Sequence, residues 1–403
     1  MSAMARIADL AEQIRGVSYD KEDASPTPKP GFLPILRAGN ITDEGLVFDD
    51  LVFVPADCIS EKQKIRKNDV IIAASSGSLD VVGKAARALQ DFDGGFGAFC
   101  KVLRPGPDVD PSYFAHFFRT PEYRRRVSSL AAGVSINNLK NEHLDEIIIP
   151  LEPLPEQRRI AAILDKADEL RAKRRAALKK LDELTQSIFL DMFGDPATNA
   201  KGFPIAHMGD VCDVRDGTHD SPKYISDGGY PLVTSKNVTG GVVDLTDVNY
   251  ISEADYVQIN KRSKVDRGDI ILPMIGTIGS PVLVDHEPCY AIKNVALIKF
   301  LKTSPSAVFV RHLLSGHYFD YIVSRKNRGG TQKFVSLGDL RAFPLPLPSK
   351  GEQQEFARRV EAVEKARTIS RTSEAELNAL FASLQHRAFS GDLVSAGRGQ
   401  LTV

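Results

Sequence analysis

The sequence predicts an α+β protein in which two mainly β domains alternate with two long helices. Apolar residues recur at steps of three and four in two stretches, residues 155–193 and 351–389. The segments before them, residues 1–150 and 197–348, hold short β-rich runs separated by turns. Both halves of the chain show the same order of features, which predicts an internal repeat.

The first long helix is expected from Pro155 to Phe193. Proline suits the first helical position because the N–H that it lacks has no partner there, and Gly194 followed by Pro196 supplies a stop. Its apolar positions form one stripe: Ile160, Ile163, Leu164, Ala167, Leu170, Ala177, Leu178, Leu181, Leu184, Ile188 and Met192. Such a stripe has to be buried against another element, so we expect a partner for this helix.

The second long helix is the expected partner. It opens with Ser349-x-x-Glu352, a capping-box pattern, and ends near Phe389. Its apolar stripe consists of Phe356, Val360, Val363, Ala366, Leu377, Leu380 and Leu384. The two stretches align at one offset, since 353 − 157 = 196 for a glutamine near each start and 389 − 193 = 196 for a phenylalanine at each end. We therefore expect the two helices to pair.

The two β-rich domains are expected to share a framework and to differ in their loops. The expected strands are residues 33–36, 46–54, 70–73, 98–103 and 147–149 in the first domain, and residues 232–233, 270–272, 282–284 and 296–300 in the second. One helix per domain is expected, starting at Pro111 in the first and covering residues 308–323 in the second. Asn40-Ile41-Thr42 matches Asn237-Val238-Thr239, whereas the surrounding loop residues differ. This pattern is typical of two binding modules with different targets.

The composition indicates an ordinary globular chain. No hydrophobic stretch has the length of a membrane span, and the N-terminus lacks the apolar core of a signal peptide, so we expect a cytoplasmic protein without a membrane partner. The four cysteines, Cys58, Cys100, Cys212 and Cys289, are far apart and are expected to be core thiols. Formal charge is 52 − 52 = 0, which gives no global reason to expect nucleic acid, although residues 171–180 hold six basic residues and no acid.

Sequence signatures of DNA chemistry are missing. Methyltransferases that modify the amino group of a flipped base use an Asn/Asp-Pro-Pro-aromatic clamp, and this sequence contains no Pro-Pro pair. Restriction nucleases commonly place an acidic residue two positions before a lysine on a metal-binding strand, and no Asp-x-Lys or Glu-x-Lys occurs. We expect no catalytic residue, no metal site and no cofactor on this chain.

The order of motifs resembles the specificity subunit of type I restriction-modification enzymes. The resemblance spans essentially the whole chain and depends on four short motifs: Ile147-Ile148-Ile149-Pro150-Leu151 followed by Leu154-Pro155-Glu156-Gln157, the ending Phe193-Gly194-Asp195-Pro196, and weaker echoes at Leu345-Pro346-Leu347 and at residues 389–393. The second copy has Ser349-Lys350-Gly351 where the first has Pro153-Leu154-Pro155.

The resemblance implies a division of labour. Residues 1–150 and 197–348 would be target recognition domains that each read one half of a bipartite, asymmetric double-stranded DNA target. Residues 151–196 and 349–395 would be spacer helices that pair as an antiparallel coiled coil about an internal pseudo-twofold axis. Two modification (methyltransferase) subunits with S-adenosylmethionine, and restriction/translocase subunits with ATP, would dock on a chain that is not itself an enzyme.

DNA-reading residues are expected to be polar, to lie on loops and to differ between the two domains, because base edges are read by hydrogen bonds. In the first domain the candidates are Arg37, Asn40, Ser76, Ser78, Lys84, Ser135, Asn137 and Lys140. In the second domain they are Thr218, His219, Lys223, Lys236, Asn237, Thr277, Arg328, Thr331, Gln332 and Lys333. A solvated polar loop is the alternative interpretation for each of these residues taken alone.

Two other functions remain open at this point. The chain would be a coiled-coil adaptor if its β-rich domains bound protein instead of DNA. It would be the specificity subunit of a methyltransferase-only complex if no restriction subunit joined it.

The apolar stripe of each long helix is interrupted by an arginine. Arg171 and Arg367 stand at equivalent positions, since 367 − 171 = 196. In an antiparallel pair Arg171 would approach Arg367, so we expect a wet centre or carboxylates such as Asp168 or Glu364 beside the arginines, in a polar layer that sets register. The alternative is that both arginines extend outward into solvent.

Overall fold

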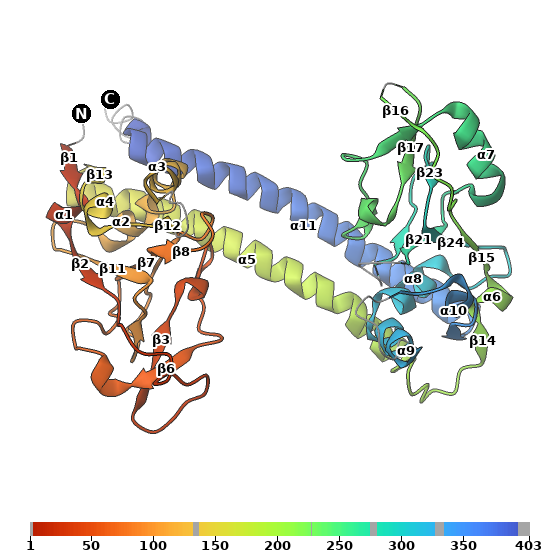
Figure 1. Cartoon of the computed structure of the whole chain (residues 1–403), viewed down its shortest axis with the longest axis horizontal. Coiled ribbons are helices and arrows are strands. Elements are labelled where there is room, and N and C mark those ends of the chain that lie inside the picture. Colours follow the sequence, from red (N-terminus) through yellow and green to blue (C-terminus); the bar gives the residue numbers. More distant parts are fainter. Residues whose placement is uncertain (1–2, 132–136, 227, 275–279, 327–333, 394–403) are drawn as a thin grey trace, which may run out of the picture. The chain divides into compact units, whose positions relative to one another are not determined.

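The computed structural model describes residues 3–131, 137–226, 228–274, 280–326 and 334–393 (Figure 1). The chain forms two compact units. Unit 1 comprises residues 1–177 and 370–403, and unit 2 comprises residues 178–369. Each unit therefore contains one β-rich region together with the beginning of one long helix and the end of the other.

Unit 1 contains mostly short strands. They are β1 (Ala3–Arg6), β2 (Ala11–Arg15), β3 (Phe32–Leu36), β4 (Ile41–Thr42), β5 (Gly45–Leu46), β6 (Val52–Pro55), β7 (Val70–Ala73), β8 (Ser75–Ser76), β9 (Ala85–Arg87), β10 (Gly95–Phe96), β11 (Cys100–Pro105), β12 (Asn137–Asn138) and β13 (Ile148–Leu151). The short helices are α1 (Ile7–Leu10), α2 (Pro111–Phe117), α3 (Pro121–Ala131) and α4 (Asn141–Asp145), with 3-10 turns at Ala38–Asn40 and Ala56–Cys58.

The strands of unit 1 form two main sheets, in the orders β2-β11-β7-β9 and β10-β3-β6. Side chains of β7 alternate between two cores: Val70 and Ile72 pack with the helices, whereas Ile71 and Ala73 pack toward the second sheet. The four-stranded sheet is thus covered by helices on one face and by the β3 sheet on the other, as Figure 1 shows. Strand β1 pairs antiparallel with β13, so the first and last strands of this β-rich region lie side by side.

Unit 2 repeats this plan. Its strands are β14 (Ile205–His207), β15 (Asp213–Asp216), β16 (Tyr224–Ile225), β17 (Tyr230–Val233), β18 (Val238–Thr239), β19 (Val242–Val243), β20 (Asn249–Ile251), β21 (Ile270–Pro273), β22 (Val282–Leu283), β23 (Ala291–Ile292), β24 (Val295–Lys299) and β25 (Pro344–Pro346). Its helices are α6 (Met208–Val211), α7 (Glu253–Ser263), α8 (Ala307–Ser315), α9 (His317–Lys326) and α10 (Leu337–Arg341), with a 3-10 turn at Ser235–Asn237.

The sheet orders of unit 2 correspond to those of unit 1. The order β15-β24-β21-β22 matches the four-stranded sheet, and β16-β20-β17-β23 matches the β3 sheet with one added strand. The parallel pair of β17 with β23 reproduces the parallel pair of β3 with β10. Strand β14 pairs with β25 as β1 pairs with β13. Two regions of different sequence therefore adopt one framework.

The two long helices are α5 (Leu154–Phe193, 40 residues) and α11 (Lys350–Ser390, 41 residues). Both expected helices are confirmed to within one residue at each end. The predicted capping box is also present, because the Ser349 hydroxyl accepts the Glu352 N–H at 3.3 Å while the Glu352 carboxylate accepts the Ser349 N–H at 2.8 Å. In unit 2, Phe189 of α5 packs on Phe356 of α11 with ring centroids 5.6 Å apart.

Several expected elements are corrected by the structure. The strand expected at residues 46–54 is interrupted between β5 and β6, where Asp50 has φ 50°. The helix expected as one piece in each domain is divided into two, α2 and α3 in unit 1 and α8 and α9 in unit 2. The chain leaves the helix before Pro121 in unit 1 and at Gly316 in unit 2. Helix α7 was not expected, although Ser252 caps it by accepting the Asp255 N–H at 3.2 Å.

Two of the four cysteines are core thiols. Cys100 and Cys212 are buried, and burial raises the pKa of each to about 12. Cys58 is half-buried and Cys289 is exposed, so the expectation is wrong for Cys289. Within the described ranges, the helices lack the combination of length and apolarity that a membrane span needs.

Candidate nucleic-acid interface

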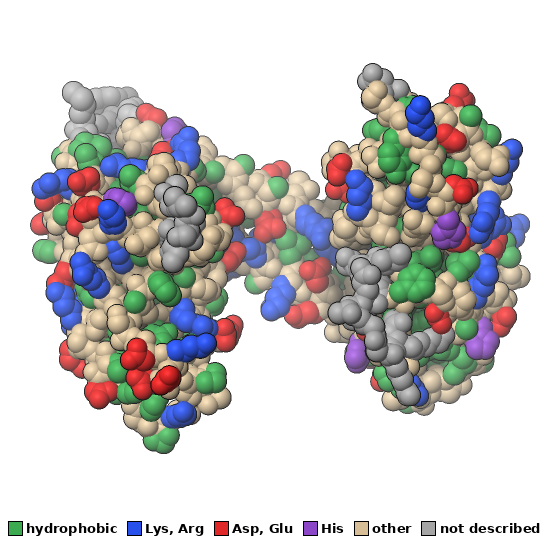
Figure 2. Space-filling view, viewed as in Figure 1, with side chains coloured by type: hydrophobic (Ala, Val, Ile, Leu, Met, Phe, Trp, Pro, Cys, Tyr) green, Lys and Arg blue, Asp and Glu red, His purple; other side chains and the backbone are tan. Residues whose placement is uncertain are grey.

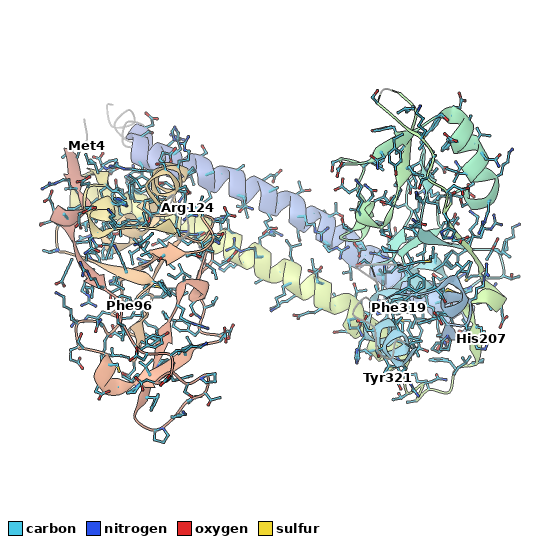
Figure 3. The ribbon with its side chains drawn as sticks, in the orientation of Figure 1. Met4, Phe96, Arg124, His207, Phe319 and Tyr321 are labelled. Atoms are coloured by element: carbon cyan, nitrogen blue, oxygen red, sulfur yellow. The ribbon has the colours of Figure 1, made fainter. Side chains whose placement is uncertain are left out.

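Several loops of unit 1 surround a groove of about 1060 Å³, called here the unit 1 groove. Its lining includes Tyr19, Lys21, Arg37, Asp50, Ser76 and Phe99. Phe96, labelled in Figure 3, is fully buried at the base of the turn that carries Phe99. The groove thus brings together three of the candidates from the sequence, Arg37, Asn40 and Ser76, with residues that sequence reasoning missed.

Arg37 is held at the edge of the unit 1 groove. Its guanidinium donates to the Asp50 carboxylate and to the Asp50 carbonyl oxygen, both at 2.8 Å. The side chains of Arg37 and Asp50 are 44% and 95% exposed, so solvent screens the pair and a competing anion or hydrogen-bond acceptor can reach the guanidinium. Ser76 lies nearby, half-buried, on β8.

Asn40 and Asn237 hold equivalent turns and do not face solvent. The Asn40 side chain accepts the Arg37 N–H and donates to the Asp49 carbonyl, both at 2.8 Å. The Asn237 side chain likewise accepts the Thr234 N–H at 3.1 Å and donates to the Asp247 carbonyl at 2.9 Å. Both residues are buried. Burial and these hydrogen bonds show that both side chains shape a loop, and contact of either with DNA stays a prediction.

Three other candidates of unit 1 lie on loops outside the lining of this groove. Lys84 pairs with Asp43 at 3.4 Å, and Lys140 pairs with Glu142 at 3.5 Å. The Ser78 hydroxyl accepts the Asp80 N–H at 3.3 Å. Lys84 and Lys140 are each paired with an acid, so each would have to exchange a carboxylate for a phosphate on binding DNA.

In unit 2, loops at the equivalent positions converge on Asn294. His219 places Nε2 2.7 Å from the Asp216 carboxylate and Nδ1 2.9 Å from Oδ1 of Asn294. The hydrogen bond to Asp216 and then that to Asn294 raise the pKa of His219, because both favour the charged ring. Both ring nitrogens of His219 are therefore occupied by partners within unit 2. Asp216 also pairs with Arg262.

The remaining described candidates of unit 2 surround this centre. The backbone N–H of Asn294 donates to the Thr218 carbonyl at 3.2 Å, and the Ser235 hydroxyl donates to the Asn294 carbonyl at 3.4 Å. Lys236 is exposed and pairs with Asp247 at 3.3 Å, while Lys223 is exposed on the neighbouring loop. Buried Lys293 donates to Ser221 at 2.7 Å, which sequence reasoning also missed.

Some candidates cannot be placed. Ser135, Thr277, Arg328, Thr331, Gln332 and Lys333 lie outside the described residues. Asn137 is described by its backbone, which pairs with Ser76 in the β8–β12 ladder.

The charge of the candidate surface is mixed. On the faces that Figure 2 shows, Lys and Arg side chains alternate with Asp and Glu side chains in both units. In the unit 1 groove, Lys21 and Arg37 are balanced by Asp49 and Asp50. Across the part of the chain that is described, no three His, Cys, Asp or Glu side chains form a group that could hold a metal ion. The candidate surfaces of both units therefore offer a ligand hydrogen-bonding groups and local charges of both signs.

Comparison with known proteins gives consistent matches. The family model described as Type I restriction modification DNA specificity domain matches residues 2–180 and again residues 201–379. The EcoKI specificity subunit of Escherichia coli K12 is 31% identical over 421 residues, covering 98% of this chain and 90% of the relative. The StySPI specificity subunit of Salmonella potsdam is 43% identical over 184 residues, covering 46% of this chain and 39% of the relative.

Solved structures share the fold at low sequence identity. The S subunit of a type I restriction-modification system from M. genitalium has a TM-score of 0.60 at 16% identity, with 96% of each chain covered. A chain solved in work on complex assembly and conformational transition of the type I R-M system has a TM-score of 0.57 at 19% identity, covering 96% of this chain and 97% of that chain.

Proposed function

Because this chain belongs to the type I restriction modification DNA specificity family, we propose that it is the DNA-recognition subunit of a type I restriction-modification complex. One observation carries the proposal: the two units share one framework and differ in the loops that surround it. Asn40 and Asn237 hold the same turn, whereas the neighbouring turns differ, with Gly97 to Phe99 in unit 1 and Lys293-Asn294 in unit 2. Loops that differ on a common scaffold suit the recognition of two unlike half-sites.

Residues 1–150 and 197–348 would each read one half of a bipartite, asymmetric duplex target. The proposed contacts in unit 1 are Arg37, Ser76, Ser78, Lys84, Ser135, Asn137 and Lys140. In unit 2 they are Thr218, His219, Lys223, Lys236, Thr277, Arg328, Thr331, Gln332 and Lys333.

Helices α5 and α11 would pair as an antiparallel coiled coil about a pseudo-twofold axis. The contacts inside each unit support this arrangement, because Arg171 donates to Asn378 at 2.7 Å and Arg367 to Asp182 at 3.4 Å. These pairs are equivalent, since 367 − 171 and 378 − 182 both equal 196. Each arginine also pairs with the acid three residues before it, Asp168 or Glu364, which supports the expected carboxylates beside the arginines, whereas the approach of Arg171 to Arg367 stays a prediction. Side-chain exposures of 17% and 24% favour arginines that lie against the helices over arginines that extend into solvent.

The partners would be two modification subunits and the restriction/translocase subunits. A chain with an internal repeat can present one surface twice, and so accept two copies of one partner. S-adenosylmethionine and ATP would bind those partners, while this chain would carry no catalytic residue and would act in the cytoplasm. The missing Pro-Pro clamp and acid-x-Lys pattern support this division.

Duplex binding and module exchange test the proposal. Affinity of the assembled complex for its target should fall steeply as salt rises, because several phosphates are neutralised. Replacing residues 200–345 by the corresponding segment of a relative should change one half of the methylated sequence and leave the other half unchanged. Weak, salt-insensitive duplex binding would instead favour the protein-binding adaptor, and a change in both halves would contradict independent units. Methylation without cleavage, with no restriction subunit recovered, would identify a methyltransferase-only complex.

A further inference from the structure

Phe99 is an exposed aromatic residue on a rigid turn. Its residue exposure is 66%, the highest among the described phenylalanines. The turn is fixed, because the Phe99 carbonyl accepts N–H groups from Ala74 at 2.8 Å and Ser75 at 3.0 Å. The Cys100 N–H donates to Gly97 at 2.8 Å, and a Cβ on Gly16 would lie 2.1 Å from the Gly97 oxygen. The structure thus holds an apolar ring in solvent, at a cost that packing does not offset.

The surroundings of Phe99 include groups that can bind base edges. Phe99 lines the unit 1 groove together with Tyr19, Ser76, the acids Asp49 and Asp50, and the cations Lys21 and Arg37. Carboxylates repel phosphate oxygens but accept hydrogen bonds from the amino groups that cytosine and adenine expose in the major groove. A groove that places acids beside an apolar ring is therefore suited to the major-groove edges of bases.

The equivalent turn of unit 2 is polar. Gly97 donates its N–H to Leu36, and Lys293 donates its N–H to Val233, both at 2.9 Å, so the two turns leave the framework at the same point. Each turn also forms a parallel bridge with the loop after a strand of the four-stranded sheet. Gly97 bridges to Val17, after β2, and Lys293 bridges to Thr218, after β15. Just after this point unit 1 presents exposed Phe99, whereas unit 2 has the half-buried, polar Asn294. The apolar ring is a property of one reading surface and not of the framework.

We propose that Phe99 is a specificity-determining residue that contacts the 5-methyl group of a thymine in the half-site read by unit 1. The thymine methyl is the apolar feature that base edges present in the major groove, and phenylalanine is one of the side chains that contact it. This inference rests on the proposed function, since it needs unit 1 to face duplex DNA. Tyr19 and Phe99 would together give this half-site an apolar contact.

Single uracil substitutions test this contact, because uracil differs from thymine only in lacking that methyl group. The target is first identified by sequencing methylated bases in a host that carries the complete complex. Each thymine of the unit 1 half-site is then replaced by uracil, and the dissociation constant of the intact complex is measured by fluorescence anisotropy. At one position, uracil should weaken binding about fourfold, the change expected when one buried methyl group is lost.

Two variants make the outcome decisive. In Phe99→Ala the thymine and uracil duplexes should bind equally well. In Phe48→Ala, which removes an exposed phenylalanine that does not line the unit 1 groove, the fourfold difference should persist. A half-site without thymine, uracil that is neutral at every position, or a difference that survives in Phe99→Ala would each overturn the inference. Loss of all sequence-specific binding in the unchanged complex would instead contradict the proposed function.

Discussion

Gln157 and Gln353, 196 residues apart, make the same two hydrogen-bonded contacts at the starts of α5 and α11. Gln157 accepts the Asp110 N–H and donates to the Glu152 carbonyl, both at 2.7 Å. Gln353 accepts the Ser306 N–H and donates to the Pro348 carbonyl, both at 2.8 Å. These partners are also repeats of one another, since 306 − 110 = 196 and 348 − 152 = 196. Each glutamine ties the start of a long helix to the loop before α2 or α8.

Replacing either buried glutamine by methionine should destabilise the protein. Gln157→Met and Gln353→Met keep the side-chain volume but leave a backbone N–H and a backbone carbonyl without these partners, at a cost of about 1–3 kcal/mol per group. Urea unfolding would measure the loss. Gln354→Met is the matched control, because Gln354 is exposed on the same turn of α11 and should change stability by less than about 0.5 kcal/mol.

The ion pair between Asp69 and Arg104 should be a second point of sensitivity. Arg104 donates twice to the buried Asp69 carboxylate at 2.8 Å, and the Arg104 side chain is itself mostly buried. Asp69→Asn leaves that guanidinium without its counter-charge, so we expect a loss of about 3–5 kcal/mol. The same change in the exposed Arg37–Asp50 pair, Asp50→Asn, should cost under about 1 kcal/mol. Equal effects in thermal unfolding of both variants would contradict this difference.

Stability should decrease in acid partly through His312. Burial, and then the neighbouring Arg311, lower its pKa to about 4, and its ring stacks on Phe189 with centroids 4.4 Å apart. The unfolded chain takes up a proton on His312 near the ordinary histidine pKa, whereas the folded chain resists that proton. The contribution of neutral His312 to the free energy of unfolding is therefore fully present above about pH 6.5 and is lost as pH falls toward 4. The loss is up to about 3 kcal/mol at 1.36 kcal/mol per pKa unit. His312→Phe should flatten the unfolding free energy over this range, and an unchanged slope would count against the assignment.

DNA affinity should depend on pH through His219. Its raised pKa keeps the ring charged above the ordinary histidine range, and the charge is lost as pH rises through that raised value. Target affinity should therefore decline with rising pH, and His219→Gln should remove that decline while weakening binding at lower pH. Lys223→Gln serves as the comparison, since it should weaken binding by a similar factor at every pH between 6 and 8. A pH profile that is the same in native and His219→Gln complexes would show that this charge does not contact DNA.

The long-range pattern was predictable from the sequence, and the short-range geometry of the loops was not. Two helix stripes that align at one offset predict α5 and α11 because helical periodicity is local and the repeat confirms it internally. Pro121 and Gly316 are helix-breaking residues in the sequence, yet one continuous helix was expected across each of them. Asn40 and Asn237 were interpreted as DNA contacts because they are polar residues in loops, but matching asparagines in loops are equally typical of residues that cap a turn.

Phe99 could not have been found in the same way. Its role depends on the bridge between Val17 and Gly97, which are 80 positions apart, since 97 − 17 = 80. DNA-reading residues were expected to be polar, and an apolar residue within an expected strand such as residues 98–103 is by default assigned to the core. The exposure of the Phe99 side chain, which the sequence does not reveal, is what distinguishes it from a core residue.

The pairing of β1 with β13, and of β14 with β25, has an evolutionary consequence. Each β-rich region begins and ends on neighbouring strands: Ala5 faces Ile149, and Ala206 faces Leu345. A genetic crossover at each of these two places would exchange a whole region while cutting the protein at a single seam in space. The exchanged region would have to fit the receiving chain mainly at the paired strands and at the faces of α5 and α11 that it packs on. Under the proposed function, such an exchange would give a lineage a new DNA target in one step, without a series of poorly folded intermediates.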